Sequence, residues 1–518
     1  MEGLKPSGRV SLNTGHPWRF YGPALVLVTS PVFDAAKRYT ESTPLASGEL
    51  ARDLAIVVLV ALGAVLAAAL LPGRHRMKGA VFTLTLLVGT GYPALAEAAG
   101  VGPCTWADTA LGLSFLACIA TVTVLWLRRA PKVLESLNGA LWLTAGISLL
   151  ISSQTAWAQF ATTPAATDRS NLGGVRVELS PDAPAPDIIH IIVDGMGRLD
   201  ELHDVYGIDS TETTRTLGGL GFRINDSAVA NYAQTYLAVS SMLSMDYLDQ
   251  AAPLATSEQD RTLTDAIIAQ ASVIRALKAR GYRFSLLSNG YQALVEHPLA
   301  DDGVMGPTLL SEFEAYVLQG TIFRILPVRA QTFVPHRERT RAVLSALGDY
   351  APGPRPRFVL AHVLLPHPPF VFDAEGRDVV PPRLFTLSDG SQFSGDAEEF
   401  RAGYAAQARF VLATLEKLLR RWSALPRPPI VIVNGDHGSG LGFNMRSPIG
   451  SNTSGRMRLF LGVKGLDDTA ALPGSPVNIY RTLFNQKFGT TLPILPDRSY
   501  VSSWPRPYAW TEVHVGAR

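Results

Sequence analysis

The first third of the chain is dominated by apolar stretches without charged side chains. Three of them have about the length of a helix that crosses a bilayer, roughly 20 residues: Leu54–Leu71, Gly79–Ala96 and Thr109–Leu127. A fourth stretch runs from about Leu137 to Phe160 and is more polar at its far end. The pattern predicts a bundle of transmembrane helices within residues 1–160.

A fifth segment, Phe20–Phe33, is less typical of a membrane span, because it has only 14 uncharged residues and contains Pro23 and Pro31. It is the weakest candidate for a fifth span, and two alternatives stay open for it. It is otherwise a surface-lying or buried segment, or a signal peptide, although the charged residues that follow make a poor cleavage region. The bundle is therefore expected to have four to five helices.

Basic residues in the short loops predict the orientation of this bundle. The loop Gly73–Lys78 and the segment Arg128–Lys132 are rich in Arg and Lys, whereas the loop Glu97–Asp108 between them has neither. Because basic loops stay on the cytoplasmic side, everything after Phe160 is expected outside the cytoplasm. The sequence thus predicts a multi-pass protein of the cytoplasmic membrane, with a linker at residues 161–186 and an extracytoplasmic domain at residues 187–518.

The extracytoplasmic part contains nearly continuous apolar runs that are rich in β-branched residues. They are Asp187–Val193, Phe358–Leu365 and Pro429–Val433. Such runs are typical of strands buried on both faces of a parallel sheet. Apolar residues at helical spacing, from Phe400 to Leu418, lie between the second and third runs. This alternation predicts an α/β domain with a mostly parallel central sheet.

Polar residues follow each of these strands, at Asp194, His367 and the pair Asp436–His437. Ligands of parallel sheets bind beyond the carboxyl ends of the strands, and a carboxylate beside an imidazole in a glycine-flanked loop suits a divalent cation. Plainer interpretations exist, since Asp-Gly is a common turn and Pro-His-Pro-Pro can form a rigid corner. Two further histidines, His190 and His362, lie inside strands and are expected to be core residues with satisfied hydrogen bonds.

The segment Asn231–Leu243 predicts a helix that begins near Thr235, with Asn231 or Thr235 as its N-cap. The positive end of the helix dipole favours a bound phosphate or sulfate there. The simpler role of Thr235 is that of a cap. Coordination to a metal would instead lower the pKa of its hydroxyl and make it a nucleophile.

Composition narrows the possible functions. The chain has 46 basic and 44 acidic residues without a concentrated basic patch, so nucleic-acid binding is not expected. Its only cysteines, Cys104 and Cys118, lie in the apolar part. The remainder therefore has no disulfide scaffold, no thiolate metal site and no cysteine nucleophile.

The order of these motifs resembles the alkaline phosphatase superfamily: a strand ending in Asp, then Asn-Tyr-x-x-Thr, Pro-His-x-Pro-Phe, and a late strand with Asp-His-Gly. It is most similar to the membrane-anchored sulfatase-like branch, which includes lipoteichoic acid synthases and phosphoethanolamine transferases. The resemblance covers about Asp187–Phe488 and implies an α/β fold of the alkaline phosphatase and sulfatase type. It also implies one divalent metal ion, zinc or manganese.

Carried over by position, the resemblance implies that Asp194, Thr235, Asp436 and His437 hold the metal. Thr235 would be the nucleophile, and His367 would contact the substrate and protonate the leaving group. Three departures matter. The transferases usually have Glu at the position of Asp194, a Trp-Arg pair for phosphoglycerol is missing from residues 281–298, and no motif for formylglycine formation is present.

The sequence therefore predicts a metal-dependent enzyme of the cell envelope that transfers a phospho-alcohol group through a Thr nucleophile. Its expected partners are the lipid bilayer and a membrane lipid or envelope glycan substrate. One alternative is a phosphoric or sulfuric ester hydrolase that works without formylglycine. Another is a non-catalytic membrane protein that retains the fold as a binding module.

Overall fold

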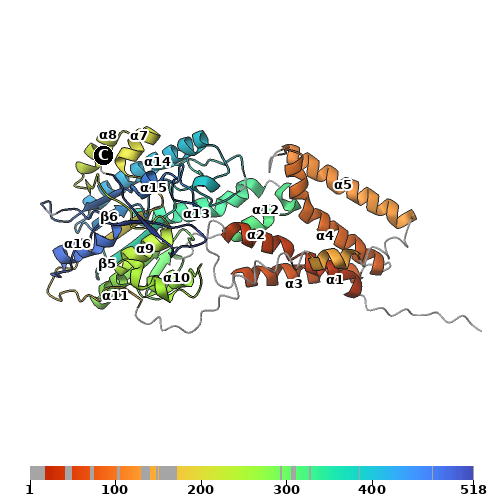
Figure 1. Ribbon diagram of the computed structural model, residues 1–518, viewed down its shortest axis with the longest axis horizontal. Coiled ribbons are helices and arrows are strands. Elements are labelled where there is room, and N and C mark those ends of the chain that lie inside the picture. Colours follow the sequence, from red (N-terminus) through yellow and green to blue (C-terminus); the bar gives the residue numbers. More distant parts are fainter. Residues whose placement is uncertain are drawn as a thin grey trace, which may run out of the picture. The chain divides into compact units, whose positions relative to one another are not determined.

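The computed structural model describes residues 18–40, 49–70, 75–101, 106–129, 140–147, 150 and 172–516, except residues 259, 292–293, 305–310, 326–327, 384 and 470. The chain forms two compact units (Figure 1). Met1–Ala36, Ser47–Ala158 and Val317–Leu326 make up the first, and the remaining residues make up the second. The segment Val317–Leu326 thus belongs to the N-terminal unit although it lies far along the chain.

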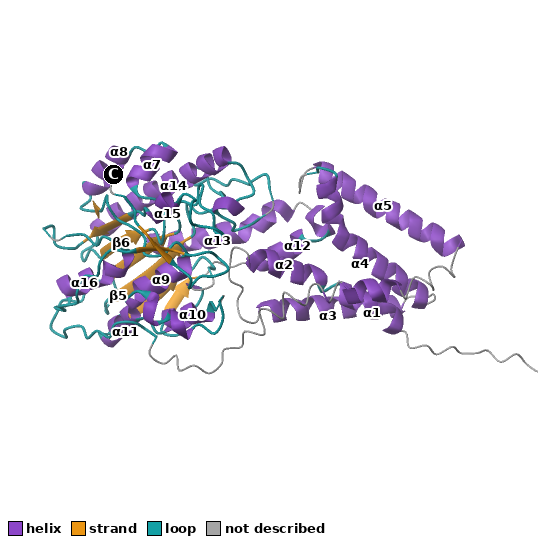
Figure 2. Cartoon of the chain, in the orientation of Figure 1, coloured by secondary structure: helices purple, strands orange, loops and turns teal. Residues whose placement is uncertain are grey.

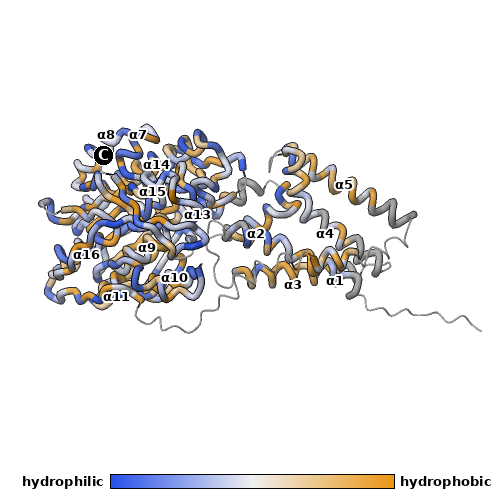
Figure 3. The backbone as a smooth tube through the Cα atoms, viewed as in Figure 1, coloured by the Kyte–Doolittle hydropathy of each residue, from blue (hydrophilic) through white to orange (hydrophobic). Residues whose placement is uncertain are grey.

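The part of the first unit that the structure describes is mainly helical. Its described helices include α1 (Trp18–Leu27), α3 (Glu49–Leu70), α4 (His75–Ala98), α5 (Trp106–Arg129) and the 3-10 turn η4 (Ile322–Ile325). Hydrophobic residues predominate along α3 (Figure 3). The three strongest predicted segments therefore are helices.

The weakest segment, Phe20–Phe33, is not one continuous helix, because a turn at Val28–Thr29 separates α1 from α2 (Ser30–Thr40). Most of the fourth stretch lies outside the described residues. Within the part of the chain that the structure describes, no helix has both the length and the hydropathy that a membrane span requires. The spans and the orientation stay predictions.

A buried polar cluster ties the late segment of the first unit to its helices. The Nε of Arg324, on η4, lies 3.3 Å from Oδ2 of Asp108 on α5, and both side chains are fully buried. The hydroxyl of Tyr92 on α4 donates to Oδ1 of the same aspartate at 2.8 Å. Asp108 ends the predicted loop Glu97–Asp108, and this position gave no indication of a partner that is 216 residues away.

The second unit is built on a seven-stranded sheet with the order β2-β7-β6-β1-β5-β3-β4. The strands are β1 (Ile188–Val193), β2 (Arg223–Ile224), β3 (Arg283–Leu287), β4 (Asp302–Val304), β5 (Arg357–Val363), β6 (Ile430–Asn434) and β7 (Leu461–Lys464). The strands from β6 to β4 are parallel, and β7 and β2 pair antiparallel at one edge. The mostly parallel α/β fold and the three predicted strands are confirmed.

Helices cover both faces of this sheet, as Figure 2 shows with the strands in the interior of the unit. On one face, Ile191 and Val193 of β1 line a common apolar space with residues of α13 (Val328–Gly348) and α14 (Ala397–Ser423). On the other face, Asn434 of β6 contacts Met242 of α9 (Thr235–Ser244). Burial on both faces explains why these strands are almost entirely apolar.

The other helices of this unit are short. They are α7 (Leu199–Tyr206), α8 (Ser210–Gly218), α10 (Thr262–Ala269), α11 (Ser272–Ala279), α15 (Thr453–Met457) and α16 (Ile479–Lys487). Helix α12 (Glu312–Gln319) begins in the second unit and ends in the first, with the boundary at Val317. A small antiparallel pair, β8 (Ser499–Val501) and β9 (Thr511–Val513), completes the fold.

One predicted core histidine is confirmed. His190 is fully buried in β1, with Nδ1 2.6 Å from the Tyr480 hydroxyl on α16 and Nε2 2.5 Å from Oδ1 of Asn434. Burial lowers the pKa of its imidazole to about 4. The ring is therefore a neutral, hydrogen-bonded part of the core.

Candidate metal and nucleophile site

The predicted site residues meet at the carboxyl edge of the sheet. Strand β1 lies between β5 and β6, so the loops after these three strands are adjacent. Asp194 follows β1, while Asp436 and His437 follow β6. These three side chains are buried and place their potential ligand atoms within 4.8 Å of one another.

The imidazole of His437 presents a lone pair to the two carboxylates. Its Nδ1 donates to the carbonyl oxygen of Gly438 at 2.9 Å. Its Nε2 lies 3.2 Å from Oδ2 of Asp436 and 3.8 Å from Oδ1 of Asp194. Burial and the charge of Arg456 lower the pKa of the His437 imidazole, which favours the neutral form that binds metals.

The two carboxylates carry oxygen atoms that fit a cation. Oδ1 of Asp436 accepts a hydrogen bond from the Gly195 amide at 2.9 Å. Oδ2 of Asp436 and Oδ1 of Asp194 are buried and have no hydrogen-bond partner among the described residues. Since buried anionic oxygens are costly without a partner, these atoms and Nε2 of His437 form a donor set for one divalent metal ion.

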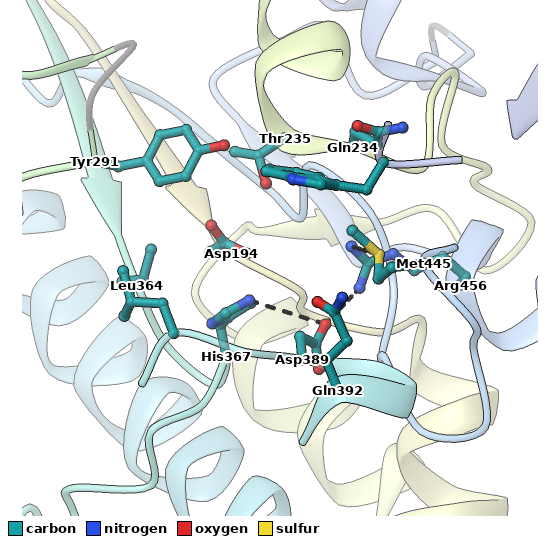
Figure 4. A pocket seen from close by; sticks show the side chains of 12 residues that line it. Asp194, Gln234, Thr235, Tyr291, Leu364, His367, Asp389, Gln392, Met445 and Arg456 are labelled. Carbon is teal, nitrogen blue, oxygen red and sulfur yellow. Dashed lines mark hydrogen bonds and ion pairs between the residues drawn. The ribbon is translucent and has the colours of Figure 1, made fainter. Parts of the chain in front are cut away.

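Thr235 lies beside this group, at the start of α9. Its Oγ1 is 3.3 Å from Nε2 of His437, and the residue is 7% exposed. In Figure 4 its side chain and those of Tyr291 and Asp194 point toward one another. The hydroxyl therefore reaches the candidate metal site from the helix.

The prediction that Asn231 or Thr235 is the N-cap of this helix is wrong. Gln234 is the N-cap, with extended backbone angles, and Thr235 is the first helical residue. The side chain of Asn231 instead accepts from the amide of Val477 at 2.8 Å. A capping role therefore does not account for the Thr235 hydroxyl.

His367 borders the same pocket, from the loop after β5. Its Nδ1 donates to the carbonyl oxygen of Pro368 at 2.6 Å, and its Nε2 lies 3.9 Å from Oδ2 of Asp389 (Figure 4). The side chain is 13% exposed, so it is the more accessible partner of this pair. The pocket between these groups is lined by Asp194, Gln234, Thr235, Tyr291, Leu364, His367, Leu387, Asp389, Gln392, Met445, Arg456 and Trp504.

The interpretation of His362 as a satisfied core residue needs correction. The residue is fully buried in β5, but neither ring nitrogen has a hydrogen-bond partner among the described residues, and its Nε2 lies 3.2 Å from Oδ2 of Asp194. Burial raises the pKa of Asp194, yet the neighbouring imidazoles, His367 first and then His362 and His437, outweigh it and hold this pKa below its usual range. The register places His362 opposite Ile192, close to the carboxyl end of β1, and only the strand order reveals this.

Two charged residues of the pocket, Asp389 and Arg456, were not predicted. Both are buried, and Oδ2 of Asp389 lies 2.6 Å from Nη1 of Arg456. Neither follows a buried apolar strand run, so no motif distinguished them. Their pairing across 67 positions is a tertiary contact.

Tyr404, on α14, holds the loop that carries Asp194. Its hydroxyl donates to the carbonyl oxygen of Gly195 at 2.7 Å and accepts from the Gly197 amide at 2.9 Å. Its ring stacks on that of Tyr206 at a centroid distance of 4.1 Å. One side chain thus satisfies two backbone groups next to a potential metal ligand.

Replacing Tyr404 with phenylalanine is expected to weaken metal binding by about 10-fold, the lower end of what loss of an outer-shell partner costs. Two buried backbone groups would lose their partner, and the Asp194 loop would lose its fixed position. Metal titration of the full chain measures the effect. The matched control is Tyr282→Phe, which removes a hydroxyl that donates to Pro186 before the start of β1. Equal metal affinity in both variants would contradict the positioning role of Tyr404.

No protein-family model and no curated protein matches the chain. Solved structures similar to it include the C-terminal periplasmic domain of EcEptC from Escherichia coli, with 13% identity, a TM-score of 0.40, and coverage of 65% of this chain and 96% of that one. The lipoteichoic acid synthase LtaP from Listeria monocytogenes has 13% identity and a TM-score of 0.34, and the match covers 65% of this chain and 83% of that one. The integral membrane protein lipooligosaccharide phosphoethanolamine transferase A from Neisseria meningitidis has 13% identity and a TM-score of 0.34. That match covers 90% of this chain and 95% of the transferase.

Proposed function

We propose that this chain is a metal-dependent enzyme that transfers a phosphoryl-containing group, with Thr235 as the nucleophile. The observation that carries the proposal is the position of the Thr235 hydroxyl, 3.3 Å from Nε2 of His437 in a buried group of two carboxylates and one imidazole. A bare alcohol attacks phosphorus poorly, so a hydroxyl in this setting fits an activated nucleophile.

Asp194, Asp436, His437 and the Thr235 hydroxyl would hold one divalent metal ion, zinc or manganese. The ion would lower the pKa of the hydroxyl and neutralise charge on the phosphoryl oxygens. The position of Thr235 in the first turn of α9 adds the positive end of the helix dipole, which favours the same anion.

His367 is proposed to assist the leaving group. Its Nδ1 is engaged with Pro368, so its Nε2 is the atom that can hold and deliver a proton in the pocket. In the first half-reaction Thr235, having lost its hydroxyl proton to solvent, would bond to phosphorus through its oxygen. The bond between phosphorus and the donor's alcohol oxygen would break, and that oxygen would take a proton from His367. In the second, an acceptor hydroxyl would return that proton and take the group from Thr235.

Transfer is favoured over hydrolysis because of the N-terminal helices predicted to lie in the membrane. An enzyme held at the outer face of the cytoplasmic membrane stays near lipid donors and envelope glycan acceptors. Hydrolysis of a released ester would require no such anchor.

The test is to detect the covalent intermediate. The full chain is incubated with manganese or zinc and the chromogenic diester bis(p-nitrophenyl) phosphate, with p-nitrophenyl sulfate in parallel, and then examined by intact-mass measurement and peptide mapping. A phosphoryl adduct on Thr235 is expected from the diester only. Turnover with an adduct on another residue would contradict the assignment, and sulfate release instead of phosphate chemistry would favour the hydrolase alternative.

A further inference from the structure

Arg456 is the one arginine among the residues that line the pocket between Thr235 and His367 (Figure 4). It comes from the short helix α15 and is 2% exposed. Burial of a guanidinium requires partners for its donors, and here those partners include residues of the site itself.

Two contacts fix the plane of this guanidinium. Its Nε donates to the carbonyl oxygen of Ala233 at 3.0 Å, and its Nη1 donates to Oδ2 of Asp389 at 2.6 Å. The Phe443 ring lies 5.1 Å from the guanidinium carbon. Because the group is planar and held at Nε and Nη1, the position of Nη2 is set as well.

The third nitrogen, Nη2, faces the metal group. It lies 2.9 Å from Nε2 of His437, the same atom that faces Asp194, Asp436 and Thr235. Nδ1 of His437 already carries the proton donated to Gly438, so Nε2 has a single lone pair. That lone pair can accept from Arg456 or bind a metal ion, but it cannot do both.

We propose that Arg456 is a substrate-binding residue that recognises a phosphoryl oxygen through Nη2, which becomes available when a metal ion takes Nε2 of His437. The inference rests on the proposed function. Without His437, Nη2 would keep the thioether sulfur of Met445 at 3.9 Å, which is a weak acceptor. An anionic oxygen bound beside Thr235 and the metal would supply a stronger one. Asp389 holds the guanidinium in place meanwhile, and its carboxylate compensates the charge of Arg456.

This role predicts opposite effects on two ligands. Arg456 competes with the metal for Nε2 of His437 and its positive charge repels a cation, so its removal should leave metal affinity unchanged or increase it. The same removal takes away a charge-assisted hydrogen bond to phosphate. A purely structural ion pair with Asp389 would instead make both affinities fall together with stability.

The experiment measures the dissociation constant of manganese, then of inorganic phosphate at saturating manganese, by calorimetry on the full chain. Arg456→Ala is expected to weaken phosphate binding by about 10- to 100-fold, with metal binding no weaker than in the parent. Arg456→Lys keeps the charge but not the forked geometry of the guanidinium, so its phosphate affinity should lie between those of the parent and Arg456→Ala. The control is Arg458→Ala, two residues away, whose partly exposed side chain pairs with Asp200 at 3.5 Å; it should change neither constant.

The outcomes separate the two proposals. If the parent binds no metal, the proposed function fails and this inference fails with it. If the parent binds metal and phosphate but Arg456→Ala binds phosphate equally well, only the role of Arg456 is overturned. If Arg456→Ala does not fold, Asp389→Asn weakens the ion pair that holds the Arg456 guanidinium in place. Unchanged phosphate affinity in Asp389→Asn would then overturn the phosphate-binding role of Arg456.

Discussion

Replacing Thr235 with alanine is expected to abolish turnover of a phosphodiester, by roughly four orders of magnitude or more, as is typical when a nucleophile is removed. The oxygen of Thr235 is the atom proposed to bond to phosphorus, and its place 3.3 Å from Nε2 of His437 has no substitute in an alanine. Gln234, not Thr235, occupies the N-cap position of α9, so the change should leave the helix intact. The rate is measured with bis(p-nitrophenyl) phosphate at saturating manganese.

The matched variant is Thr235→Ser, which keeps a hydroxyl at the same position and should retain part of the activity. Thermal unfolding of both variants shows whether the fold is preserved. If Thr235→Ala turns over at the parental rate, the nucleophile is another group and the transferase proposal has to be abandoned.

Replacing Asp436 with asparagine, or His437 with alanine, is expected to remove most metal binding. In the proposed site only a few protein ligands would hold the ion, and each must be deprotonated and correctly placed. The loss should exceed the roughly 10- to 100-fold that an outer-shell partner costs. Metal-dependent stabilisation is the measurement: at a metal concentration of about 100 times the dissociation constant, the parent should gain about 2.7 kcal/mol of unfolding free energy.

The metal-free proteins supply an independent check of this site. Oδ2 of Asp436 is buried without a hydrogen-bond partner among the described residues, so neutralising this carboxylate should not destabilise the metal-free fold. Asp436→Asn is thus expected to unfold no earlier than the metal-free parent, yet to gain nothing from added manganese. His203→Ala, a change at an exposed histidine on α7, controls for adventitious metal binding. A metal-dependent shift that persists in Asp436→Asn and His437→Ala would place the metal elsewhere.

Much of the site could be predicted because parallel strands share one carboxyl edge. Apolar runs identified β1, β5 and β6, and a polar residue after each run had to lie at that edge. This argument required no knowledge of side-chain contacts. It brought Asp194, His367 and Asp436–His437 together correctly, whereas their chemical roles stay proposals.

The same argument failed where the identity of a neighbour mattered. His362 has the pattern of a core residue and is one, but the pairing of β5 with β1 also brings it to 3.2 Å from Asp194. Thr235 has the residue type of an N-cap, but the backbone turns helical one residue earlier than a cap would allow. Residue type and burial pattern are compatible with both outcomes in each case.

The amino-acid sequence by itself thus determined the α/β class, the three central strands and the edge of the sheet where the candidate site residues lie, because continuous apolar runs record burial on both faces of a sheet. Only the tertiary structure decided which strands are neighbours, that Val317–Leu326 joins the N-terminal unit, and that Arg456 meets Asp389 and His437. The physical reason is that a local pattern reports whether a side chain is buried. The partner it meets depends on long-range packing and on the closure of long loops, which local sequence does not encode.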